Sequence, residues 1–198
     1  MQEIDGFILV GGRSTRMGTD KATLKLGGRS FINNVAEALG SVTNSIRLVG
    51  RAGADPNELF PFVSDAYRDC GALGGIHAAL NAANRNWVLV VACDLPFVTD
   101  KLLLRLAHLR SGFEAVAPIQ ENGIPQPLCA LYRVDPSLDQ ACEMIKRGER
   151  RPFALLQSLR TRWVGFDELS DLDSAEYFFD NINTPDDYAR AITNKRRE

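Results

Sequence analysis

The stretch that decides the fold is GFILVGG at residues 6–12, a continuous apolar run ended by two glycines. A run without polar alternation is typical of a strand buried on both faces, as in parallel sheets. The next residues, RSTRMGTDK at 13–21, carry two arginines and a lysine. Flexible glycine backbone and positive charge directly after a buried strand predict a loop that binds an anion.

Strands and helices alternate outward from this first strand. The sequence predicts strands ending at Gly50, Asp65 and Asp94, and helices over 30–40, over 71–84 and from Thr99. Alternation of buried strands with helices predicts a mostly parallel sheet with helices on both faces. The expected fold is therefore an open, doubly wound, Rossmann-like α/β fold.

The pattern changes after residue 112. Two strand-like runs, 113–119 and 126–134, are separated by QENGIP, whose glycine and proline mark a turn. They predict an antiparallel excursion near the sheet edge. Helices over 136–147 and 152–159, a strand in TRWVGF at 161–166, and a last helix capped by TPDD at 184–187 complete the expected order.

Composition limits the possible classes of protein. With 198 residues, 45% of them hydrophobic, and a net charge of −2, the chain is expected to form a single domain over 1–198, with no charge excess for nucleic-acid binding. The sequence contains no leader pattern and no membrane-length apolar run. We expect a cytoplasmic protein that binds neither nucleic acid nor membrane.

The cysteines and histidines carry no recognisable catalytic pattern. Four cysteines without CxxC pairing are expected to be reduced and structural. The histidines, His77 and His108, lie in predicted helices without a triad-like context, so acyl transfer and zinc chemistry are disfavoured. We interpret His77 as structural.

The candidate site lies where the parallel strands end, because open α/β sheets bind ligands beyond their carboxyl ends. The first loop is neither a Walker A motif nor GxGxxG. Its cations are nevertheless dense, with Arg13, Arg16, Lys21 and Lys25 against Asp20. Arginine can bind phosphate oxygens bidentately and lysine adds a mobile charge. The loop therefore indicates a polyphosphate, and a solvated glycine-rich turn is the alternative.

Asp94 follows WVLVVAC, the most apolar predicted strand. Opposite a phosphate loop, its carboxylate is expected to bind Mg²⁺, which proteins hold through few carboxylates together with substrate phosphates. The alternative is a structural role in the turn before Thr99. Asp65 has the same ambiguity, because an aspartate at a strand end also shapes ordinary turns.

Three glycines in CGALGG at residues 70–75 open the helix that contains His77. They exceed what helix propensity favours. Close approach of the backbone to a flat ligand such as a purine would account for them, and so would tight packing against the sheet.

Taken together, LVGGRSTRMGTDK, GALGG, ACDLPF, QPLCALYR and NINTPDD resemble the molybdenum cofactor guanylyltransferases, a family of molybdopterin nucleotidyltransferases. The resemblance spans residues 9–188. It implies a nucleotidyltransferase fold and transfer of GMP from GTP, with Mg²⁺, to the terminal phosphate of molybdopterin, releasing pyrophosphate. It divides the chain into a nucleotide-binding half, about 1–110, and an acceptor-binding half, about 111–190.

The resemblance also implies residue roles, which run along the chain. Catalytic roles fall on Arg16, Lys21 and Asp94, with the metal on Asp94. Nucleotide contacts fall on Leu9, Val10, Gly11, Gly12, Lys21, Asp65, Gly74 and Asp94. Asn181 and Asn183 are candidates for a second metal or acceptor contact, or they only shape the turn before Thr184. The run KRGERR at 146–151 either binds the acceptor phosphate or complements a helix dipole.

Two departures from the family pattern concern base selectivity. Val10 replaces the usual alanine and Ala72 the usual proline. Three alternatives remain open. Two are enzymes: a cytidylyltransferase acting on the same pterin, and a transferase for another phosphorylated acceptor. The third is a non-catalytic nucleotide-binding regulatory module. Transient contact with proteins that deliver or receive the cofactor is also expected from the resemblance.

Overall fold

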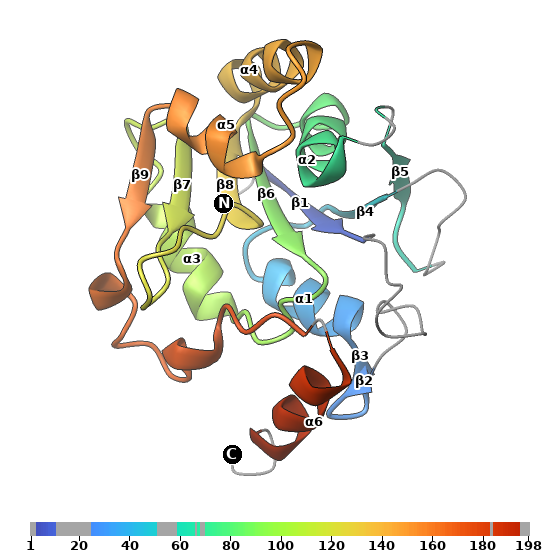
Figure 1. The fold of residues 1–198 in the computed structure, drawn as a ribbon, viewed down its shortest axis with the longest axis vertical. Coiled ribbons are helices and arrows are strands. Elements are labelled where there is room, and N and C mark those ends of the chain that lie inside the picture. The colour runs from blue at the N-terminus through green and yellow to red at the C-terminus, as the bar shows by residue number, and fades with distance from the viewer. Residues whose placement is uncertain are drawn as a thin grey trace.

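The computed structural model describes residues 3–10, 25–50, 59–65, 67, 70–182 and 184–194. Within them a seven-stranded sheet has the order β5-β4-β1-β6-β8-β7-β9 (Figure 1). Its strands are β1 (Ile4–Leu9), β4 (Ile46–Gly50), β5 (Phe62–Ser64), β6 (Trp87–Ala92), β7 (Ala115–Pro118), β8 (Cys129–Arg133) and β9 (Thr161–Val164). All pairings are parallel except those of β8 with β6 and β7. This confirms the mostly parallel α/β fold.

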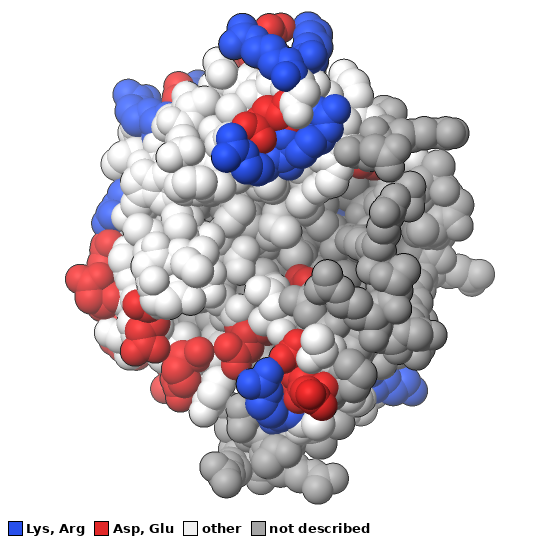
Figure 2. All heavy atoms as spheres, in the orientation of Figure 1, with Lys and Arg blue, Asp and Glu red and all other residues white. Residues whose placement is uncertain are grey.

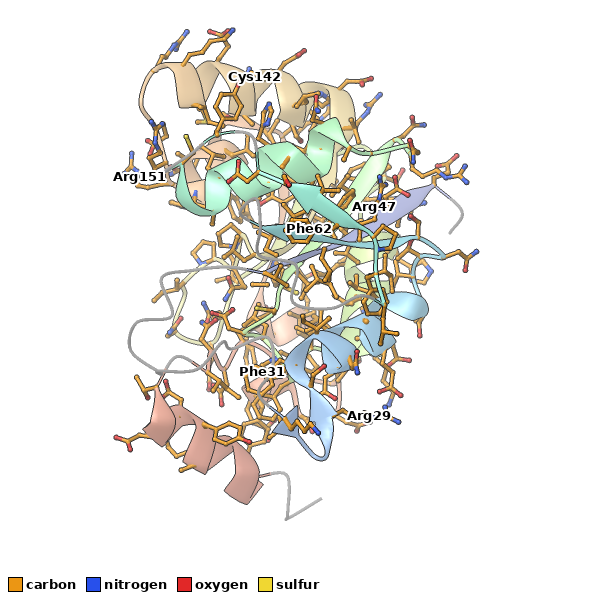
Figure 3. The ribbon with its side chains drawn as sticks, turned by 90° about the vertical axis from the view of Figure 1, so that its right-hand side faces the viewer. Arg29, Phe31, Arg47, Phe62, Cys142 and Arg151 are labelled. Carbon is orange, nitrogen blue, oxygen red and sulfur yellow. The ribbon has the colours of Figure 1, made fainter. Side chains whose placement is uncertain are left out.

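Helices cover both faces of the sheet (Figures 1 and 3). One layer contains α1 (Phe31–Gly40) and α3 (Asp100–His108); the other contains α2 (Gly71–Asn81), α4 (Val134–Lys146) and α5 (Pro152–Ser158). Two buried apolar clusters correspond to these layers. Every residue of β1 and β6 is buried. The apolar runs predict this for β6 and for β1 from Gly6 on, and the buried Asp5 precedes the predicted run.

The order in which strands are added to the sheet reverses at β1. From β1 it passes through α1 to β4 and on to β5, and α2 then crosses back to place β6 on the other side of β1. The carboxyl ends of β1 and β6 therefore flank the topological switch point, where such sheets bind ligands.

The antiparallel excursion is confirmed, but it lies deeper in the sheet than the sequence predicts. β8 pairs with the central β6 in the register Val88↔Tyr132, and β7 pairs on its other side. The edge position is taken by β9, which is parallel to β7. A short strand that pairs with a non-neighbouring segment leaves no local signal of its place in the sheet.

Most helix starts agree with the sequence, but α4 begins at Val134, before the predicted start at Pro136. The Ser30 hydroxyl accepts the N–H of Asn33 at 3.2 Å, and the Thr99 hydroxyl that of Leu102 at 3.3 Å. In α6 (Pro185–Asn194) Thr184 Oγ1 accepts the Asp187 N–H at 3.1 Å, and Asp187 Oδ2 accepts the Thr184 N–H at 2.9 Å. This reciprocal cap confirms the start predicted from TPDD.

A small hairpin next to α6 was not predicted. It consists of β2 (Lys25–Leu26) and β3 (Arg29–Ser30), joined by Gly27 and Gly28 at φ +62° and +82°. The Gly-Gly pair is the local signal for such a turn. The Tyr188 hydroxyl of α6 donates to the Lys25 carbonyl at 2.6 Å, which ties the last helix to the hairpin.

A buried ion pair lies on the side of the sheet where the parallel strands begin, which we call the amino edge. Asp5 is 1% exposed, and its Oδ2 accepts from Arg47 Nη2 at 2.8 Å and from the Asn84 N–H at 2.6 Å. Arg47 also donates to the Ala82 carbonyl and lies over the Phe7 ring. The pair joins β1 and β4 to the loop before β6, so it is a structural contact.

Candidate functional site

The carboxyl ends of the parallel strands β1, β4, β5 and β6 lie together on one side of the sheet, which we call the carboxyl edge or site edge (Figure 1). Hydrogen bonds continue the ladders beyond the strands. The Val10 N–H donates to Val49 O at 2.8 Å, the Asp65 N–H to Gly50 O at 2.8 Å, and the Cys93 N–H to Leu9 O at 3.0 Å. Residues that are far apart in sequence thereby become neighbours, as the strand assignments predict.

Glycine at the end of β4 permits this convergence. A Cβ on Gly50 would collide with the carbonyl oxygen of Val10, and would lie 3.3 Å from the Phe62 ring. A side chain there would push apart the ends of β1 and β4. Gly50 therefore has a packing role in forming the site edge.

Leu9 and Val10 lie at this edge, but their side chains face the two cores. Leu9 is 8% exposed and packs in the cluster on the α2 side, and Val10 is 5% exposed in the cluster on the α1 side. Contact of these residues with a ligand would therefore come from the main chain. The next predicted residues, Gly11 and Gly12, lie outside the described part of the chain.

Asp65 is held in a turn at the end of β5. Its Oδ1 accepts the Tyr67 N–H at 2.8 Å, two residues on, as in an Asx-turn. The carboxylate lies against α2, because a Cβ on Gly74 would be 2.7 Å from Asp65 Oδ2. Asp65 therefore has the structural role in a turn that the sequence offered as one alternative. The residue is half-buried and lies at the site edge.

The glycines of α2 make close contacts inside the protein. Gly74 makes room for Asp65, and a Cβ on Gly75 would lie 3.3 Å from Leu9 Cδ2. Packing is thus sufficient to explain both residues, and a nucleotide contact at Gly74 stays a prediction. Gly71 differs: it has φ +58°, is exposed, and a Cβ there would meet nothing within 4 Å. The left-handed φ is the reason for glycine at this position.

Asp94 lies just beyond β6, at the switch point. It is half-buried, and its main-chain carbonyl accepts the Ile182 N–H at 3.1 Å. This bond brings the segment around Asn181, which is exposed, to the end of β6. The structure thus joins two motifs, ACDLPF and NINTPDD, that the sequence analysis assigned to one site.

Asp180, an exposed acidic residue, lies close in sequence to the hydrogen bond between Ile182 and Asp94. Asp180 lies two residues before Ile182; desolvation raises the pKa of its carboxyl, an effect that Arg190 opposes and Asp187 reinforces. Asp180 directly precedes Asn181 in the motif FDNINTP.

His77 packs behind the site edge. It is 8% exposed, its ring meets Tyr67 edge-on at a centroid distance of 4.8 Å, and its Nε2 is 3.2 Å from Cys142 Sγ. Burial lowers the pKa of the imidazole, and the charge of Asp65 partly offsets this shift. These contacts agree with the structural interpretation of His77.

The cysteines are free thiols. Cys70, Cys93 and Cys129 are buried and Cys142 is half-buried. Burial raises the pKa of the Cys129 thiol to about 12. A thiol with so high a pKa is unreactive near neutral pH.

Several predicted site residues lie outside the described residues. They are Gly11, Gly12, Arg13, Arg16, Lys21 and Asn183. Their assignments stay predictions.

The assignment of a metal to Asp94 stays a prediction, and the chemistry of a single carboxylate is compatible with a hard cation bound together with substrate. Within the described ranges, no three histidine, cysteine or acidic side chains cluster as a complete metal cage. Mg²⁺ usually binds through one or two carboxylates, with substrate phosphates and water as its other ligands. Asp94 offers such a carboxylate.

The basic run at 146–151 pairs with acidic neighbours on and after α4. Lys146 and Arg147 pair with Glu143 at 3.0 and 3.8 Å, and Arg151 with Glu149 at 2.6 Å. The Arg151 guanidinium and backbone N–H groups lower the pKa of Glu149 to about 2. Figure 2 shows this basic group over α4 and α5, separated from a surface rich in acidic side chains. The acceptor role of the run stays a prediction.

The fold and its ligand edge define the class: a doubly wound α/β protein of the nucleotide-binding type. A family model described as "MobA-like NTP transferase domain" matches residues 6–162, and the chain belongs to this family. It is therefore a nucleotidyltransferase, as its sequence motifs predict. Among the described residues, no helix has the length and apolar character needed to cross a membrane.

Named relatives align over nearly the whole chain. A "Probable molybdenum cofactor guanylyltransferase" of Pelotomaculum thermopropionicum is 34% identical, over 96% of this chain and 93% of its own. A "Molybdenum cofactor guanylyltransferase" of Vibrio atlanticus is 33% identical over 91% of both chains. The crystal structure of "Molybdopterin-guanine dinucleotide biosynthesis protein A" from Archaeoglobus fulgidus is 29% identical, with a TM-score of 0.82 over 98% of this chain and all of that one. The family resemblance is thus confirmed.

Proposed function

We propose that the protein transfers GMP from GTP to the terminal phosphate of molybdopterin, forming the guanine dinucleotide cofactor and pyrophosphate. The observation that carries this proposal is the near-complete alignment with relatives that bear the guanylyltransferase name, combined with Asp94 at the switch point. The nucleotide would occupy the half up to about residue 110, and the acceptor the half from about 111 to 190.

The reaction balances as a single displacement. An oxygen of the molybdopterin phosphate forms a bond to the α-phosphorus of GTP, and the bond from that phosphorus to the bridging oxygen breaks, so pyrophosphate leaves. A phosphate monoester is largely ionised at neutral pH, and no protein nucleophile is needed. Catalysis then depends on positioning and on stabilisation of charge.

The chain's residues would supply this positioning. Asp94 would hold Mg²⁺, which when bound neutralises phosphate charge. Main-chain groups of Leu9, Val10, Gly11 and Gly12 would approach the nucleotide, and Arg16 and Lys21 would contact its phosphates.

Further contacts would come from the other strands and from the last loop. Asp65 would contact the nucleotide from β5, with Gly74 packed on its carboxylate. Asn181 and Asn183 would contact the acceptor, a role supported by the bond from the Ile182 N–H to the Asp94 carbonyl.

The direct test is transfer of label. We expect that incubation with GTP labelled at the α-phosphate, Mg²⁺ and molybdopterin moves the label to the pterin and releases pyrophosphate. Competition by unlabelled CTP tests base selectivity, because Val10 and Ala72 depart from the family pattern. If unlabelled CTP reduces the labelling of the pterin as strongly as unlabelled GTP does, the enzyme is not selective for guanine. If pyrophosphate is released but the pterin is not labelled, molybdopterin is not the acceptor.

Cellular context is part of the same proposal. We place the reaction in the cytoplasm, with transient contacts to proteins that deliver molybdopterin or receive the product. Co-purification of the labelled product with a partner protein would support this handover.

A further inference from the structure

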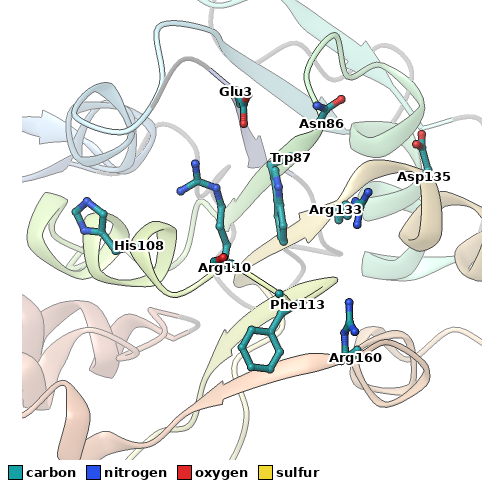
Figure 4. Close-up of a pocket in the computed structure, with 11 residues that line it drawn as sticks. Glu3, Asn86, Trp87, His108, Arg110, Phe113, Arg133, Asp135 and Arg160 are labelled. Atoms are coloured by element: carbon teal, nitrogen blue, oxygen red, sulfur yellow. The ribbon is translucent and has the colours of Figure 1, made fainter.

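A pocket of about 500 Å³ lies at the amino edge of the sheet, the opposite edge from Asp94 (Figure 4). Trp87, the first residue of β6, lines it. Arg133, the last residue of the antiparallel β8, pairs with Trp87 in the ladder and lines it too. Because one strand carries Trp87 and then leads to Asp94, the two edges are ends of the same buried strand.

Three arginines from separate segments line the pocket. Arg110 follows α3, Arg133 ends β8 and Arg160 precedes β9. In Figure 4 the guanidinium of Arg160 points toward Arg133. The sheet therefore gathers cations that are distant in sequence.

These arginines differ from most others in the described part of the chain. Seven guanidinium groups elsewhere meet carboxylates: Arg29–Glu37, Arg47–Asp5, Arg105–Asp171, Arg147–Glu143, Arg151–Glu149, Arg162–Glu168 and Arg190–Asp187. Within the described residues, the side chains of Arg133 and Arg160 have no such partner, and Arg110 donates only to the Ala107 carbonyl. Among the described residues outside the pocket, Arg85 and Arg150 also have no carboxylate partner, so the distinction of the pocket is that it gathers three such arginines. Glu3 and Asp135 also line the pocket, but they do not pair with these arginines.

We propose that this pocket binds a small phosphate-bearing molecule, at a site separate from the nucleotide edge. Guanidinium groups match phosphate oxygens bidentately, and arginines gathered in a concave surface concentrate anions there. A lone phosphate would fill a small part of 500 Å³, and the volume is that of an ordinary small-molecule site. Trp87 and Phe113 also line the pocket and would contact the organic part of the ligand.

The test uses Trp87 as a local reporter. The chain has two tryptophans, and Trp163→Phe leaves Trp87 alone. The full-length variant is titrated with inorganic pyrophosphate in the presence of a chelator, and emission is recorded. We expect a saturable change in emission that sodium chloride at equal ionic strength does not produce.

Charge variants decide whether the arginines are responsible. In the Trp163→Phe background, Arg133→Gln with Arg160→Gln should weaken binding by about tenfold or more, because charge-assisted hydrogen bonds are lost. Arg29→Gln with Arg105→Gln removes two ion-paired arginines outside the pocket and should leave binding unchanged. Circular dichroism confirms that each variant is folded, and single substitutions replace the double one if it is not.

Three results would overturn the proposal. They are no saturable change, an equal change with sodium chloride, and equal pyrophosphate affinity in the Arg133 and Arg160 variant. None of them bears on guanylyl transfer, which has its own assay and uses the opposite edge.

Discussion

The two edges of the central sheet use aspartate in opposite ways. At the amino edge Asp5 is 1% exposed and meets the Arg47 guanidinium and a backbone N–H, so its charge is matched inside the protein. At the carboxyl edge Asp94 is half-buried and lies just beyond β6, beside the switch point. Strand direction separates the two, because every strand of the β5-β4-β1-β6 group ends at the same edge. Asp5 therefore stabilises the fold, whereas a role of Asp94 in the reaction is the prediction that the following variants test.

The largest expected effect is loss of activity on removing the charge of Asp94. Asp94→Asn should lower the transfer rate by about 10²–10³-fold or more, because an electrostatic group that acts on the transition state is lost. The melting temperature should change little. Asp139→Asn, an exposed change on α4, is the matched control. Activity near that of the unmodified protein would remove Asp94 from the mechanism.

The reverse result is expected at the amino edge. Asp5→Asn leaves the Arg47 charge without its partner, so stability should fall by about 3–5 kcal/mol in urea unfolding. Molecules that remain folded should keep their transfer activity. Asp171→Asn removes the acid of the more exposed Arg105 pair and should cost less than about 1 kcal/mol. Equal losses in both variants would show that burial of the pair is unimportant.

Alanine variants of the adjacent residues Gly74 and Gly75 test whether the position of Asp65 matters at the carboxyl edge. Gly74→Ala would place a Cβ 2.7 Å from Asp65 Oδ2 and should cost about 1–3 kcal/mol, with a rise in the KM for nucleotide. Gly75→Ala meets the end of the Leu9 side chain at 3.3 Å, and alanine also favours the helix by about 1 kcal/mol. Its net effect should be close to zero. Equal effects in the two variants would argue against a role for the Asp65 position.

The smallest expected effect is on the pH dependence of stability. Burial lowers the pKa of His77, so below the ordinary histidine pKa the unfolded chain binds a proton that the folded protein resists. The contribution of His77 to the free energy of unfolding is therefore constant above about pH 6.5 and declines as the pH falls below that value. Melting temperatures between pH 7.5 and 5.5 should fall less steeply in His77→Phe than in the unmodified protein.

His108 provides the control for that measurement, because it is exposed at the opposite edge. His108→Gln should leave the pH slope as it is in the unmodified protein. If His77→Phe also leaves the slope unchanged, the imidazole does not resist protonation in the fold.

Local signals accounted for the strands of the main sheet and for the α-helices, but not for the small hairpin or for the position of every strand in the sheet. The apolar run of β6 is buried throughout, and TPDD forms the expected cap, because both depend on neighbouring residues. The place of β8 beside β6 depends on pairing between distant segments, so the sequence suggested only an antiparallel excursion. The same reason explains why three arginines at one pocket were not anticipated.

By itself the sequence determined the alternation of strands and helices, the residues that follow each strand and the family motifs, because these are properties of order and spacing. Only the tertiary structure decided that Gly74 makes room for the Asp65 carboxylate, that the Ile182 N–H reaches the Asp94 carbonyl, and that Asp5 is buried against Arg47. Each of these contacts joins two different segments of the folded chain. Their energies depend on burial and distance, which order along the chain does not specify.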